Sequence, residues 1–167
     1  MPRAAVVAGQ VLPSFASLWQ NYPRDALDAV KRMIGGEVDS PDIKNTCTIR
    51  LSRALNYSGH PVPARYPGLW VASGADGMWY ALRVRDMRCY VEARYGPPAF
   101  HWPGAEGADE EIAHDRRTPF LRHRGIILFL ADFTNATGHF DIWDGIGVRF
   151  HDYFYEAREI LLWPTNW

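Results

Sequence analysis

The sequence predicts an α+β fold in which helices from the N-terminal part pack on an antiparallel sheet from the C-terminal part. Apolar residues recur with helical spacing in the first part of the chain, and the last third changes to alternating or continuous apolar runs separated by glycine-rich turns. The chain has 167 residues, enough for one buried core, and it contains no internal repeat. We therefore expect a single domain over residues 1–167.

Helical spacing predicts three helices. The stretches with apolar residues three or four positions apart are 27–34, 47–55 and 87–91. A glycine follows each of them, as is typical of helix C-termini. Asn45 or Thr46 can cap the second helix, and Asp86 can cap the third.

Four stretches predict strands: 78–84, 125–133, 139–143 and 159–163. The run 125–133 (GIILFLADF) is continuously apolar at its start, which is typical of a strand buried on both faces. Gly145 and Gly147 predict a hairpin bend after the third strand. Residues 99–123 are polar and rich in turn residues, so we expect a long loop over the surface.

Composition and motifs exclude several classes of protein. The formal net charge of −1 argues against a polybasic nucleic-acid binder or a protein held to membranes by charge. No apolar run approaches the roughly 20 residues that cross a bilayer. The segment Ala4–Leu12 is interrupted by Gly9 and Gln10, so we expect synthesis in the cytoplasm without a signal peptide. Metal-ligand spacings, phosphate-binding glycine motifs and GxSxG are absent, so we expect no metal and no cofactor.

Cys47 is the candidate nucleophile. In the first turn of a helix a thiol meets unpaired backbone N–H groups and the positive end of the helix dipole, both of which favour the thiolate. The backbone N–H of Cys47 could also hold a developing oxyanion. The alternative is a small buried apolar residue, which is also the role we expect for Cys89 in the middle of the third helix.

His139 is the candidate base. A nucleophilic thiolate needs an imidazole within hydrogen-bond reach. Four other histidines lie in polar or Pro/Gly-rich stretches, where solvated side chains are expected: His60, His101, His114 and His123. His139 instead opens an alternating strand directly after Gly138, and we expect this glycine to leave room for another chain beside the ring.

Two carboxylates could orient the imidazole. Asp141 follows His139 by two positions on the same strand and therefore shares its face. If the bend centres near residues 145 and 146, Asp152 lies opposite His139 across the hairpin, at roughly 5 Å between Cβ atoms. We favour Asp152 because opposed residues are closer, and we keep Asp141 as the alternative. Either could be an ordinary solvated carboxylate.

Three segments carry a resemblance to a known family. NTCTIRLSRALN (45–56) with Gly59 resembles the nucleophile segment of the fourth family of type VI secretion amidase effectors. ATGHFDIWDG (136–145) resembles its histidine segment, and ILLWP (160–164) resembles its last strand. The resemblance implies a papain-like, NlpC-type fold and a cysteine amidase that cleaves peptidoglycan stem peptides between D-glutamate and meso-diaminopimelate.

The resemblance also implies site residues and partners. Cys47 matches the nucleophile, His139 the base, and Asp152 comes nearest to the orienting aspartate. Asn45, Thr46 and Trp143 lie in the matching motifs and are candidates for contact with substrate. Such effectors pass through the type VI apparatus into a competitor's periplasm, and a cognate immunity protein blocks them. The alternatives are a non-catalytic relative that binds murein or a partner, and a papain-like acyltransferase or deamidase acting on proteins.

Overall fold

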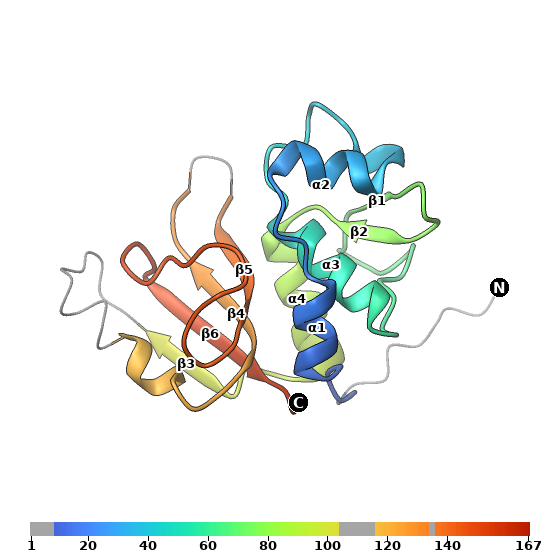
Figure 1. Cartoon of the computed structure of the whole chain (residues 1–167). Helices are drawn as coiled ribbons and strands as arrows, with labels where there is room; N and C mark the ends of the chain where they lie inside the picture. Colours follow the sequence, from blue (N-terminus) through green and yellow to red (C-terminus); the bar gives the residue numbers. More distant parts are fainter. Residues whose placement is uncertain (1–8, 104–115, 134–135) are drawn as a thin grey trace.

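A computed structural model describes residues 9–103, 116–133 and 136–167 of the chain (Figure 1). Helices gather on one side of the molecule and a four-stranded antiparallel sheet lies on the other (Figure 1). The predicted α+β architecture is therefore confirmed. The α-helices are α1 (Phe15–Asn21), α2 (Leu27–Ile34), α3 (Cys47–Tyr57) and α4 (Val84–Tyr95), and two 3-10 turns are η1 (Gly36–Val38) and η2 (Thr118–Phe120).

The large sheet has the strand order β3-β6-β4-β5, with β5 at one edge. Its strands are β3 (Phe100–Pro103), β4 (Gly125–Leu130), β5 (Gly138–Trp143) and β6 (Glu159–Pro164). A separate two-stranded sheet pairs β1 (Val71–Ser73) with β2 (Trp79–Ala81). The predicted strands 125–133, 139–143 and 159–163 therefore exist, with small differences at their ends.

Both faces of the large sheet are buried. Ile126 and Leu128 belong to the core that the sheet shares with α1, α3 and α4, whereas Ile127 and Phe129 pack in a second core with Phe154. Because alternate residues of a strand point to opposite faces, a strand between two cores must be apolar at every position. This explains the continuous apolar run in β4.

Near α4 the predicted cap was wrong and the predicted strand was too long. Arg83, not Asp86, is the N-cap residue, so the predicted strand 78–84 is shortened to β2. Asp86 lies within the first turn, where the helix dipole favours a carboxylate, and it accepts the backbone N–H of Trp70 at 3.4 Å. The strand β1 and the short helix α1, which Ser14 caps by accepting the N–H of Ser17, were not predicted.

The segment 99–123 is only partly a surface loop. Phe100–Pro103 forms β3, which pairs with β6 and extends the sheet. Residues 104–115 lie outside the described part, as does most of the segment considered as a signal peptide. The single domain over 1–167 therefore stays a prediction. Among the described residues, no helix has the length and apolar character needed to cross a membrane.

Candidate active site

Cys47 is the first residue of α3 and opens onto a cleft. Thr46 is the N-cap residue, but its hydroxyl accepts no backbone N–H of the first turn; the Asn45 side chain accepts the backbone N–H of Cys47 at 2.9 Å instead. Cys47 is 3% exposed. It lines a cleft of about 310 Å³ with Leu27, Lys44, Asn45, Thr46, Arg50, Phe133, Gly138, His139, Phe150 and Tyr153.

His139 faces this cleft from β5 and is held by Asp141. The Nε2 atom of His139 lies 2.8 Å from Oδ2 of Asp141, and the Asp141 side chain is fully buried. The two residues share one face of the strand because they are two positions apart. With Nε2 directed at Asp141, the imidazole has Nδ1 left for the thiol of Cys47.

Asp141 also anchors the segment that follows the strand. Its carboxylate accepts backbone N–H groups at 2.8–3.1 Å from Ile142, Arg149, Phe150 and His151. These bonds fix the carboxylate in place and fold residues 149–151 back over the end of the cleft. The histidine is therefore oriented by a rigid partner rather than by a mobile surface carboxylate.

The environment of His139 favours its charged form. Burial by itself lowers the pKa of the imidazole, but the hydrogen bond with Asp141 and the interaction with the Cys47 thiol outweigh it and raise the pKa to about 9. An imidazole with that pKa is protonated at neutral pH. A protonated imidazole can form an ion pair with a thiolate at the N-terminus of a helix.

The prediction that Asp152 lies opposite His139 was wrong. After Trp143 the chain makes one isolated bridge to Val148, and residues 149–151 then bond to the Asp141 side chain instead of continuing a ladder. Asp152 is left partly exposed and pairs weakly with Arg117, at 3.5 Å. The alternative, Asp141, is the carboxylate that contacts the imidazole.

Arg50 was not predicted, and it supports the helix side of the cleft. It is 1% exposed, donates from Nε to Thr46 Oγ1 at 3.0 Å and from Nη1 to the Pro23 carbonyl at 2.9 Å, and stacks 3.9 Å from the Phe150 ring centre. We call residues 45–50 the helix wall, and β5 with residues 149–153 the sheet wall. The sequence shows an arginine about one helical turn after the candidate nucleophile. Without the fold, that arginine could not be distinguished from one on the surface.

Three aromatic rings that were not predicted lie beside His139: two belong to the sheet wall and the third is Phe133. Tyr153 packs edge-on against His139 with ring centres 4.9 Å apart, and Phe133 packs against Tyr153 at 4.7 Å. Phe150 lies 6.4 Å from the His139 ring centre and is 44% exposed. These rings limit the motion of the imidazole and offer an apolar surface beside it.

Of the three residues predicted to contact substrate, two line the cleft and one does not. Asn45 and Thr46 line the cleft, whereas Trp143 does not reach it: its ring is fully buried in the second core and its Nε1–H donates to the Phe120 carbonyl at 2.9 Å. Gly138 lets the neighbouring strand come close, in agreement with the prediction: a Cβ there would lie 2.7 Å from the Phe129 carbonyl oxygen and 3.2 Å from Val84. Cys89, expected to be structural, is exposed.

Comparison with known proteins identifies the family. The sequence model of one protein family matches residues 43–163 of the chain: Tae4, the type VI secretion system (T6SS) amidase effector protein 4. The chain belongs to the Tae4 family. It is therefore a T6SS amidase effector, and the resemblance noted in the sequence is confirmed.

Solved Tae4 structures agree with the fold. Tae4 from Salmonella Typhimurium, in a complex with the immunity protein Tai4, is 26% identical with a TM-score of 0.80; the match covers 92% of this chain and 99% of that chain. Tae4 from Enterobacter cloacae is 24% identical, with a TM-score of 0.80 and coverage of 95% and 99%. The fold of this chain is thus the papain-like Tae4 fold. No curated protein sequence matches it.

Proposed function

We propose that this Tae4 chain is a cysteine amidase that hydrolyses the bond between D-glutamate and meso-diaminopimelate in peptidoglycan stem peptides. One observation carries the proposal: a cysteine at the start of α3 shares a cleft with an imidazole that a fully buried aspartate holds at 2.8 Å. This arrangement of thiol, imidazole and carboxylate suits nucleophilic acyl transfer.

The reaction proceeds in two steps. The Cys47 thiolate attacks the carbonyl carbon of the D-glutamate side of the bond, and the imidazolium of His139 protonates the leaving amine of diaminopimelate as the C–N bond breaks. Water then attacks the thioester, His139 takes its proton, and the thiolate leaves. Asp141 holds His139 with Nε2 engaged throughout.

The oxyanion requires a donor at the helix wall. The backbone N–H of Cys47 is one such donor, and in the free protein it donates to Asn45 Oδ1. When substrate binds, the developing oxyanion replaces that neutral amide oxygen as the acceptor, because hydrogen bonds to charged acceptors are stronger. A single donor of this kind contributes about 3 kcal/mol to transition-state stabilisation.

Digestion of purified muropeptides tests this function. Mass spectrometry of the products should show cleaved stem peptides with the wild type and none with Cys47→Ala or His139→Ala, each shown by circular dichroism to be folded at the assay temperature. Cleavage by the Cys47→Ala protein would overturn the mechanism. Release of ammonia rather than a new peptide amine would instead indicate a deamidase.

Thiol labelling tests the nucleophile separately. Because Cys89 is exposed and would react as well, the comparison needs a Cys89→Ser background. In that background Cys47 should react with iodoacetamide near pH 6–7, and His139→Ala should slow the reaction by about tenfold or more because the thiolate loses its partner. Equal rates in the two proteins would show that His139 does not activate Cys47.

We also propose that the protein acts in a competitor's periplasm and that a cognate immunity protein blocks it. Relatives from Salmonella Typhimurium and Enterobacter cloacae are bound to Tai4 immunity proteins in solved complexes. Expression directed to the periplasm should lyse cells, and co-expression of the cognate immunity protein should prevent lysis. Equal toxicity in the cytoplasm would contradict a cell-wall target.

A further inference from the structure

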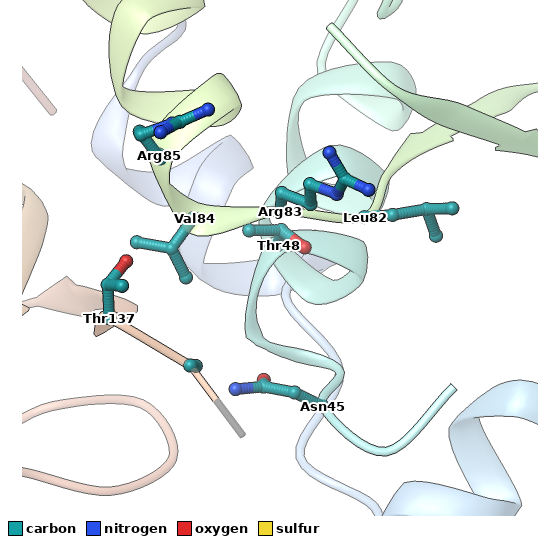
Figure 2. A pocket seen from close by; sticks show the side chains of 8 residues that line it. Asn45, Thr48, Leu82, Arg83, Val84, Arg85 and Thr137 are labelled. Atoms are coloured by element: carbon teal, nitrogen blue, oxygen red, sulfur yellow. The ribbon is translucent and has the colours of Figure 1, made fainter. Parts of the chain in front are cut away.

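A second hollow opens beside the catalytic cleft. It has a volume of about 260 Å³ and is lined by Asn45, Thr48, Leu82, Arg83, Val84, Arg85, Ala136 and Thr137. Figure 2 shows these side chains: Asn45 and Thr48 come from the start of α3, Thr137 from the segment entering β5, and Arg83 and Arg85 from the segment entering α4.

This hollow adjoins the catalytic cleft at two places. Asn45 lines both, and Thr137 immediately precedes Gly138 and His139 of the cleft. A peptide whose scissile bond lies at Cys47 therefore places the group next to that bond at this hollow. The Cys47 N–H binds the oxygen of the Asn45 side chain and not its nitrogen, so the amide nitrogen of Asn45 can donate to a ligand.

The two arginines place positive charge at the start of α4, beside the hollow. Among the described residues, neither forms an ion pair with a carboxylate. Both are exposed, and cations in the first turn of a helix are disfavoured by its dipole. Arg83 is nevertheless ordered, because its guanidinium stacks 3.8 Å from the centre of the Trp70 ring, which is itself 56% exposed.

A stacked guanidinium keeps its N–H edge available for a planar anion. The hollow thus combines two cations, hydroxyl and amide groups from Thr137 and Asn45, and apolar surface from Leu82 and Val84. That combination suits a carboxylate on a short aliphatic chain. Both residues beside the proposed scissile bond fit this description, since glutamate and diaminopimelate each keep one carboxylate outside that bond.

We propose that Arg83 and Arg85 form a specificity subsite for a free carboxylate of the stem peptide next to the scissile bond. This inference rests on the proposed function for the identity of the peptide. It assigns to these arginines a role in selecting carboxylate-bearing over amidated stem peptides.

The test uses three forms of one synthetic stem peptide: unmodified, amidated at the free glutamate carboxylate, and amidated at the free diaminopimelate carboxylate. Wild type should cleave at least one amidated form with a kcat/KM about tenfold lower or more, as expected for loss of a charge-assisted contact. Arg83→Gln/Arg85→Gln should lower kcat/KM for the unmodified peptide by a similar factor and remove the discrimination. Arg122→Gln, an exposed arginine elsewhere, serves as the control and should match wild type.

Binding to the Cys47→Ala protein, measured by calorimetry with the same peptides, separates the two proposals. If wild type cleaves all three forms equally, or if the double variant keeps the discrimination, the subsite is wrong and the amidase proposal stands. If no form is cleaved but binding still depends on both the arginines and the free carboxylate, the subsite stands and the proposed reaction fails. Binding unaffected by the arginines overturns the subsite in either case.

Discussion

At the start of the helix wall the side-chain hydrogen bonds of Asn45 and Thr46 stay within one helical turn, whereas in the sheet wall a single carboxylate joins the imidazole to the loop that follows the strand. On the helix wall, Asn45 binds the N–H two residues later and Thr46 accepts from Arg50, four residues later. On the sheet wall, the Asp141 carboxylate binds His139 and the backbone of residues 149–151 together.

This difference shows that the thiol and the imidazole of one site can be positioned in different ways. A thiol gains reactivity from the helix end itself, which a short segment provides. An imidazole needs a partner in a fixed direction, which a strand supplies only when the following loop folds back and locks the carboxylate. Apart from replacement of Cys47 itself, we therefore expect changes on the sheet wall to have larger effects on catalysis than changes of similar size on the helix wall.

The largest expected effect is that of Asp141→Asn. An asparagine can donate to His139 Nε2 and so favours the wrong tautomer, and we expect kcat to fall by at least about 100-fold. Asp152→Asn is the matched control and should stay within about threefold of wild type, because exposed pairs contribute little. Steady-state kinetics on muropeptides measures both, with thermal unfolding to confirm folding. A greater loss from Asp152→Asn would reverse the assignment of the two carboxylates.

The pH dependence of stability measures how strongly the sheet wall holds the charged imidazole. The pKa of His139 is raised from an ordinary 6.5 to about 9 in the folded protein. Its stabilising contribution is therefore complete below about pH 6.5 and is lost as the pH rises through about 9, with an upper limit on the order of 3 kcal/mol. Urea unfolding between pH 6 and 10 should show this loss in wild type and not in His139→Gln. Parallel pH profiles of the two proteins would contradict it.

On the helix wall, Arg50→Met should destabilise the fold by about 2 kcal/mol. It leaves the buried Pro23 carbonyl and Thr46 hydroxyl without their donor. Arg53→Met, three residues further along α3, is the control. The ion pair between Arg53 and Asp76 is long, at 3.8 Å, and should contribute less than about 1 kcal/mol to stability. Chemical denaturation compares the two variants. Equal losses would mean that Arg50 does not anchor this wall.

A smaller loss is expected from Gly138→Ala, which tests the close packing behind His139. The added Cβ meets the Phe129 carbonyl oxygen at 2.7 Å, so β4 and β5 must separate slightly, at about 1–2 kcal/mol. Gly147→Ala provides a control, since nothing lies within 4 Å of a Cβ at that position. Its effect on the melting transition should be close to zero. An unchanged melting temperature for Gly138→Ala would show that the strands tolerate the methyl group.

The sequence by itself determined the fold class, the helix that begins at Cys47 and the strand that carries His139. These features depend on apolar periodicity, capping residues and glycine positions within short segments, and local sequence expresses them directly. The family was also recognisable from the residues around Cys47 and His139. The catalytic roles of these residues stay predictions that the muropeptide experiments test.

Only the tertiary structure decided which carboxylate meets the imidazole and what encloses the cleft. Asp152 was favoured because a hairpin ladder was assumed to continue, but the backbone N–H groups of residues 149–151 bind the Asp141 carboxylate and hold the chain there. Trp143 is buried because the sheet has a core on both faces. Both results depend on groups far apart in the sequence that bind buried polar atoms or cover apolar surface. A local sequence pattern does not contain that information.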